Sequence, residues 1–326
     1  MKICFLDQTL FSYNSKDVNS PKLRGAETVL INLANSLSKL GNQITIINNC
    51  PNNCIIDNIK WININNLDHI PEFDLTISNN DIRLFDKTIS PKKILLSHSL
   101  QSLEKFIRKG QMIAYLKHRP KIALLSDYHK KKRLLFTRMF GHFILTYGVD
   151  DIFLNSKIYD INDINKNLAV FTSRSDRNLD LLIKIWKTKI FPQFKSGKLL
   201  ITPTKTKTND LNIFSRNLLD RENLINDISK SRIFMVPGHK AELFCLAAEE
   251  ARELCVPIVT LGIGSLSERV IHGKTGFIAK DESQFAEYSL SIFKNDIIWD
   301  NLRANLVTMR GSKNWIKCSQ NLINNI

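Results

Sequence analysis

The chain has 326 residues, 43% of them hydrophobic and 24% charged, which is ordinary for a soluble globular protein but too long for one typical core. Since no stretch approaches the roughly 18 consecutive apolar residues of a membrane span, we expect a cytoplasmic protein, neither exported nor integral to a membrane. A net charge of +15 and a pI near 9.5 predict an anionic partner, whether nucleic acid, anionic lipid or a phosphorylated small molecule.

The first half of the chain alternates short apolar strands with helical stretches, which indicates a parallel sheet wrapped by crossover helices. Residues 2–6 predict a strand, 27–40 an amphipathic helix and 43–47 the next strand. Gly41 follows that helix, where a residue tolerant of positive φ is favoured. Further strands are predicted at 75–78, 93–97, 122–125 and 142–145.

The polar stretch 151–167 has no apolar periodicity, so we expect the domain junction there. The predicted fold class is α/β, with Rossmann-like domains over 1–160 and 161–326 whose parallel sheets face each other across a cleft. We expect the last helix to pack back on the N-terminal domain. In the second half, strands are predicted at 168–172, 198–201, 232–236 and 258–261, and helices at 179–189, 220–230 and 246–254.

The six cysteines form no disulfide or metal framework. Cys50 and Cys54 are a close pair, but no second pair or histidine cluster completes a zinc site. We therefore expect free thiols in a reducing compartment, with neither a metal nor a cofactor.

Basic residues crowd the segment 105–138, which Asp127 and the adjacent Glu104 oppose. Aromatic and aliphatic residues such as Phe106, Tyr115 and Leu135 interleave with them, as on an amphipathic surface that lies against anionic headgroups. Such a surface would make the protein peripheral on the inner face of a membrane. A solvated helical face over a core is the alternative. The basic residues are Lys105, Arg108, Lys109, Lys117, Arg119, Lys121, Lys130, Lys131, Lys132, Arg133 and Arg138.

The densest chemical signal is the run 236–260, which leads from a strand end through a loop and a helix into the next strand. Glu242 and Glu250 would lie roughly 12 Å apart on one helix, a span that suits the two ends of a nucleotide sugar. The amides and dipole of the helix N-terminus favour a phosphate between them. Alternatively, Glu249, Glu250 and Glu253 are ordinary solvated helix residues, which fits Glu253 best.

Two further strand-to-helix loops carry weaker signals. Gly264 lies in a glycine-bearing loop whose backbone can approach a ligand closely. Arg174 and Arg177 lie beside a helix N-terminus and together suit a diphosphate. Asp176 offers the alternative of a local ion pair with one of them.

The run from Pro237 to Gly276 resembles the nucleotide-sugar-binding core of the family 4 glycosyltransferases, which have the two-domain GT-B fold. That signature combines two glutamates separated by seven residues, an alanine-rich helix, a proline-led strand, a glycine-bearing loop and a Gly-x-x-Gly turn. Looser matches at Gly25–Glu27, at Gly41 and at Tyr147–Asp150 extend the resemblance over most of the chain. The signature positions are occupied by Glu242, Glu250, Ala251, Pro257, Gly264, Glu268, Gly273 and Gly276.

The resemblance implies a role for each site residue in a retaining transferase. Glu250 would bind the donor ribose and Glu242 the transferred sugar, while Arg174 and Arg177 would neutralise the diphosphate. The amides around Phe244, Cys245 and Leu246 would bind sugar hydroxyls or phosphate. Gly25 and Gly264 would let loops approach the donor, and His98 resembles a histidine that lines the acceptor side. The implied catalytic residues are Glu242, Arg177 and His98.

Three departures from the family pattern concern the donor's identity. Arg174 and Arg177 are closer together than usual, Cys245 replaces a common glycine, and Asn42 replaces the usual histidine after Gly41.

Arginines and helix amides can stabilise a departing diphosphate as a divalent metal does, and no Asp-x-Asp motif lies in a plausible position. We therefore predict a metal-independent hexosyltransferase acting by front-face displacement. The acceptor would be a glycan or a lipid-linked molecule in cell-surface polysaccharide or lipopolysaccharide synthesis. An epimerase or sugar phosphorylase of the same architecture is the alternative. A nucleic-acid-binding protein has only charge in its favour, so we expect no nucleic-acid partner.

Overall fold

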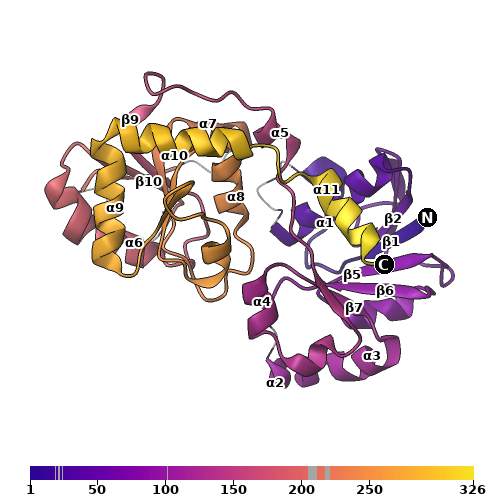
Figure 1. Ribbon diagram of the computed structural model, residues 1–326. Coiled ribbons are helices and arrows are strands. Elements are labelled where there is room, and N and C mark those ends of the chain that lie inside the picture. The colour runs from indigo at the N-terminus through magenta and orange to yellow at the C-terminus, as the bar shows by residue number, and fades with distance from the viewer. Residues whose placement is uncertain (19, 21–22, 24, 101, 205–210, 217–220) are drawn as a thin grey trace. The chain divides into compact units, whose positions relative to one another are not determined.

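The computed structural model describes residues 1–18, 20, 23, 25–100, 102–204, 211–216 and 221–326, and the chain forms two compact units (Figure 1). Unit 1 comprises Met1–Gly148 and Lys313–Ile326, and unit 2 comprises Val149–Ser312. The division after Gly148 differs from the one expected after residue 160. The segment in between is part of unit 2, because Asp150 caps a short helix and Phe153 is buried in that unit's core.

The described strands of unit 1 form one sheet in the order β3-β4-β2-β1-β5-β6-β7-β8, parallel except for the β3–β4 pair. The strands are β1 (Lys2–Leu6), β2 (Gln43–Asn48), β3 (Cys54–Ile56), β4 (Ile59–Asn63), β5 (Leu75–Asn79), β6 (Lys92–Leu96), β7 (Lys121–Leu124) and β8 (His142–Ile144). The helices are α1 (Gly25–Lys39), α2 (Leu103–Arg108), α3 (Gln111–His118), α4 (Asp127–Lys132) and α11 (Trp315–Asn324), with short helical turns at Ser15–Asp17, Ile82–Lys87 and Leu135–Arg138.

Apolar burial explains the core of unit 1. α1 turns Val29, Leu30 and Leu33 into the core, at the 3–4 residue spacing of an amphipathic helix. It ends before Gly41, whose φ of +82° confirms the predicted helix end. The C-terminal helix α11 packs on α1 within the same unit (Figure 1).

The described strands of unit 2 form a parallel sheet in the order β11-β10-β9-β12-β13-β14. The order reverses between β9 and β12, and open sheets of this kind bind ligands at that switch point. The strands are β9 (Asn165–Phe171), β10 (Lys198–Ile201), β11 (Ile213–Ser215), β12 (Ser231–Met235), β13 (Ile258–Thr260) and β14 (Gly276–Ile278). The helices are α5 (Asp151–Leu154), α6 (Leu179–Ile185), α7 (Arg221–Ser229), α8 (Leu246–Glu253), α9 (Glu282–Lys294) and α10 (Asp296–Met309), with helical turns at Trp186–Ile190, Phe191–Gln193 and Gly264–Glu268.

The α/β class with two parallel-sheet units is confirmed. The helix predicted over 179–189 is α-helical to Ile185 and continues as a π-helical turn to Ile190. The helix predicted from residue 220 is described from Arg221, and residue 220 lies outside the described residues. Among the helices described, none has the length and apolar character needed to cross a bilayer.

Candidate active site

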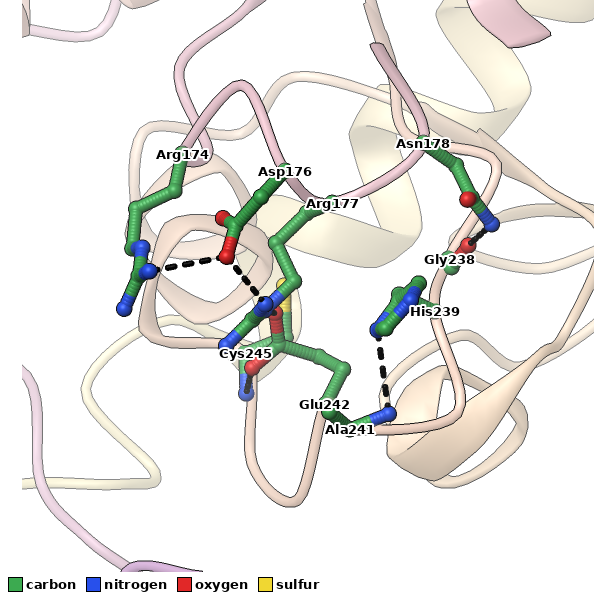
Figure 2. A network of polar contacts seen from close by, with 9 residues as sticks. All are labelled: Arg174, Asp176, Arg177, Asn178, Gly238, His239, Ala241, Glu242 and Cys245. Atoms are coloured by element: carbon green, nitrogen blue, oxygen red, sulfur yellow. Dashed lines mark hydrogen bonds and ion pairs between the residues drawn. The ribbon is translucent and has the colours of Figure 1, made fainter.

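Unit 2 gathers three predicted site residues at its switch point. β9 pairs with β10 on one side and β12 on the other, so the loops that leave β9 and β12 start at the same edge of the sheet. Arg174 and Arg177 lie in the loop after β9, and Glu242 lies in the loop after β12. Figure 2 shows the two loops side by side. Arg177 Nε lies 3.5 Å from Glu242 Oε2. The residues therefore meet where the topology favours a ligand.

Asp176 lies between the two arginines. Its Oδ2 atom is 2.7 Å from Arg174 Nη2 and 2.9 Å from Arg177 Nη1 (Figure 2). The sequence suggested a pair with one arginine, whereas the carboxylate pairs with both. A diphosphate that binds these guanidinium groups must therefore compete with Asp176.

Glu242 is held by groups on both sides of its carboxylate. Its Oε1 atom accepts a hydrogen bond of 3.1 Å from the Cys245 amide, and its Oε2 atom faces Arg177. Burial raises the pKa of the Glu242 carboxyl, while the Arg177 charge and the Cys245 amide act to lower it. The amide predicted to bind a sugar is thus bonded to Glu242 in this structure.

The loop before α8 presents its backbone, because the Phe244 and Cys245 side chains are buried. Cys245 has a φ of +62°, in the left-handed region that favours glycine, which agrees with the glycine common at this place in the family. α8 begins at Leu246, so Glu242 precedes the helix and Glu250 lies within it. The separation estimated for two glutamates on one helix therefore does not apply.

Close backbone contacts support the Glu242 loop. Asn178, at the start of α6, donates a 2.5 Å hydrogen bond to the Gly238 carbonyl, and His239 Nδ1 accepts one from the Ala241 amide (Figure 2). A Cβ atom on Gly264 would lie 2.7 Å from the Glu242 carbonyl oxygen. Gly264 is therefore required for this close approach between loops, whatever it contributes to a ligand.

Glu250 occupies a second polar region of unit 2. Burial raises the pKa of its carboxyl to about 7; the charges of Arg221 and Arg216 act to lower it, and that of Asp150 to raise it. Arg221 forms an ion pair with Asp150, and Arg216 Nε lies 3.0 Å from Asp227. Sequence reasoning did not single out Arg216 and Arg221. The signal that could have identified them in the sequence was a predicted strand-to-helix connection with an arginine at each end.

Glu249 and Glu253 are not solvated helix residues. Both side chains are fully buried. The alternative that these are solvated residues, which the sequence favoured most for Glu253, is therefore wrong for both. Glu249 pairs with Arg252 and Arg269, and Glu253 pairs with Arg252, so each buried carboxylate has a cationic partner.

In unit 1, the carboxyl edge of the sheet carries the other predicted residues. Gly25 is the first residue of α1, and His98 lies two residues beyond β6. The His98 amide donates to Asn80 Oδ1 at 2.8 Å. Burial lowers the pKa of the His98 imidazole to about 4, so it is neutral at physiological pH.

A pocket of about 390 Å³ lies at the switch point of unit 1, between β1 and β5. Polar residues at or after the ends of β1, β5 and β6 line it, together with the start of α1. They include Asp7, Glu27, Asn79, Asp81 and Ser99.

The basic segment of unit 1 combines buried and exposed residues. Phe106 and Tyr115 are buried in the core, and buried Arg133 donates to Thr137 Oγ1, so these residues belong to no surface. The side chain of Lys105 lies outside the description. Large apolar side chains in the segment 105–138 and directly beside it are nevertheless exposed, namely Leu103, Ile107, Ile113, Leu116, Leu135 and Met139.

Residues 205–308, all within unit 2, match the family described as "Glycosyl transferases group 1". Unit 2 therefore resembles the group 1 glycosyltransferases over less than half of the chain. The matched range includes Glu242, Glu250 and Gly264, and the resemblance to the family 4 glycosyltransferases is confirmed. No curated protein matches the chain in sequence.

Several solved structures share the fold of this chain. Sucrose-phosphate synthase from Thermosynechococcus elongatus is similar with a TM-score of 0.68 and 13% identity, over 99% of this chain and 98% of its own. HepE from Anabaena, in complex with UDP and glucose, has a TM-score of 0.68 and 14% identity, over 100% and 99%. WaaG, a glycosyltransferase involved in lipopolysaccharide biosynthesis, has a TM-score of 0.66 and 11% identity, over 99% of both chains.

Proposed function

We propose that this glycosyltransferase moves a hexose from a nucleoside diphosphate sugar to a glycan or lipid-linked acceptor, with retention of anomeric configuration. The cluster of Arg174, Arg177 and Glu242 at the switch point of unit 2 carries the proposal. It combines two cations, which suit a diphosphate, with a carboxylate, which suits sugar hydroxyls. HepE, which shares the fold, is also known in complex with UDP-glucose, and this supports the donor class.

In the proposed complex, the diphosphate replaces Asp176 on Arg174 and Arg177. The transferred sugar bonds to Glu242, and the ribose bonds to Glu250. The bond between the anomeric carbon and the diphosphate oxygen then breaks, and the arginines together with the amides at the start of α8 stabilise the charge on the leaving group. These groups supply the positive charge that a divalent metal would otherwise supply, so the chemistry needs no divalent metal.

Front-face displacement is favoured because both oxygens of Glu242 are engaged, by Cys245 and Arg177. A carboxylate held in this way is poorly placed to attack the anomeric carbon itself. The acceptor oxygen would therefore form its bond on the face that the diphosphate leaves. Its proton would pass to an oxygen of the departing phosphate, which balances the step without a protein base.

We place acceptor binding in unit 1, at the polar pocket between β1 and β5. Its carboxylate and amide side chains can accept and donate hydrogen bonds to sugar hydroxyls. His98 is next in sequence to Ser99, which lines the pocket, and a neutral imidazole there can accept or donate one further bond. A cell-surface glycan fits this chemistry, and the similarity to WaaG in fold supports a lipopolysaccharide-type acceptor.

A membrane-bound acceptor would also explain the exposed apolar residues in and directly beside the basic segment 105–138. Apolar side chains can enter the headgroup boundary while the basic ones bind anionic lipid. Ile113→Ser with Leu135→Ser should reduce binding to phosphatidylglycerol vesicles at least threefold. Ile55→Ser with Ile297→Ser is the matched control, since the four side chains are between 72% and 78% exposed. Equal binding of the two double variants to the vesicles would contradict the proposed contact with a membrane.

The function itself is tested by incubating the purified protein with nucleotide sugars and candidate glycans, and assigning the product anomer by NMR. The expected product keeps the donor's anomeric configuration, and an inverted product would contradict the mechanism. Conversion of the donor with no acceptor present would instead indicate an epimerase.

A further inference from the structure

Four buried charged residues form a network that links α8 to Arg269, with Glu249, Arg252 and Glu253 lying in the helix. Arg269 Nη1 lies 2.9 Å from Glu249 Oε1, and Arg252 bridges Glu249 and Glu253 at 3.0 and 2.5 Å. Glu253 Oε2 also accepts a 2.7 Å hydrogen bond from the Gly311 amide. Each of the four charged side chains is at most 6% exposed. The network therefore has fixed partners and little access to water.

Arg269 also contacts the loop that enters the candidate site. Its guanidinium carbon lies 4.3 Å from the centre of the buried Phe244 ring, a distance at which a cation–π interaction is favourable. Phe244 directly precedes Cys245, whose amide bonds to Glu242. Arg269 thus contacts the loop whose backbone amide, at Cys245, holds the Glu242 carboxylate.

The ion pair between Arg269 and Glu249 affects Glu250, the second glutamate of the candidate site. Successive residues on an α-helix point about 100° apart, so the direction of one side chain fixes that of the next. Glu249 points into the interior toward Arg269, and its neighbour Glu250 is partly exposed. The Arg269–Glu249 pair therefore constrains the rotation of α8, and with it the direction in which Glu250 points.

A buried ion network adds little stability compared with apolar side chains of similar volume, because each charge loses its hydration. Such a network restricts the relative orientation of the paired side chains, since an ion pair has fewer acceptable geometries than an apolar contact. We propose that Arg269 is a positioning residue of the donor site, which holds the Phe244–Cys245 loop and the Glu249–Glu250 turn in one relative arrangement. The inference rests on the proposed function of that site.

Arg269→Lys keeps the charge beside Glu249 and removes the flat guanidinium from Phe244. Titration of UDP and GDP into the protein should give at least a fivefold higher Kd for the diphosphate that the wild type binds. The donor KM should rise by the same factor, with kcat changed less than threefold.

Arg232→Lys is the matched control. Arg232 is also fully buried, pairs with Asp296 at 2.7 Å and lies 5.0 Å from the Trp299 ring, and it is not among the site residues. Its variant should show a similar fall in melting temperature with an unchanged Kd. An Arg269→Lys variant that binds as tightly as Arg232→Lys overturns the positioning role.

The double variant Glu249→Leu with Arg269→Leu separates positioning from stability. Apolar replacement of both partners should keep the melting temperature near that of the wild type, yet the Kd should remain at least fivefold higher. Wild-type affinity in a folded double variant would overturn the inference while leaving the proposed function intact. Failure of the wild type to bind any nucleoside diphosphate would instead overturn the proposed function, and this inference with it.

Discussion

Replacing Asp176 by asparagine should strengthen diphosphate binding. The carboxylate lies 2.7 Å from Arg174 and 2.9 Å from Arg177, and both guanidinium groups must turn from it to bind phosphate. Asp176 is half exposed and Arg174 more so, and ion pairs in such positions contribute about 0.2–1 kcal/mol each. Two such pairs correspond to a gain in affinity of about twofold to thirtyfold, at 1.4 kcal/mol for each tenfold change.

Isothermal titration of UDP and GDP into wild-type and Asp176→Asn protein measures this gain. The difference should shrink at high salt, because exposed charges are screened. Asp160→Asn is a suitable control, since the exposed Asp160 carboxylate forms an ion pair with Arg303 elsewhere in unit 2. An equal or weaker affinity of Asp176→Asn would refute the reasoning, because it would show that Asp176 orients the arginines instead of competing for them.

Three further variants or conditions test the site. Burial raises the pKa of the Glu250 carboxyl to about 7, so the folded protein binds this proton more tightly than the unfolded chain does. The free energy of unfolding that this proton contributes is lost as the pH rises through 7. Glu250→Gln should therefore be more stable than the wild type by about 1–3 kcal/mol at pH 8 and no more stable near pH 4, as measured by urea unfolding. Glu242→Gln should lower the transfer rate by about 10²–10³-fold with an unchanged circular dichroism spectrum. A chelator should leave the transfer rate within twofold, and complete loss restored only by a divalent ion would contradict a metal-independent mechanism.

The parallel strands were predictable because their apolar runs are short and bounded by polar residues. β1 and β10 begin and end where the sequence placed them. The β3–β4 hairpin was missed because its strands lie in an asparagine-rich stretch with a weak apolar pattern. Asp57 and Asn58 form its turn, both with positive φ, and this pair was the local signal that was available.

At the site, sequence spacing identified the chemical groups but not their pairing. The loop after β9 showed Asp176 as a possible partner of one arginine, and only the fold shows the carboxylate between both. The buried network was missed for a similar reason. Glu249 and Glu253 look like solvent-facing residues in a short helix, and their partners Arg269 and Gly311 lie outside it in sequence.

The central claim is that Arg177, Glu242 and Glu250 bind one nucleoside diphosphate sugar. Titration of a panel of such donors into wild-type, Arg177→Ala and Glu250→Ala protein tests it most directly, with thermal unfolding as the check on folding. We predict that the wild type binds at least one donor and that each variant binds it at least tenfold more weakly while still folded. Wild-type affinity in both variants would contradict the account.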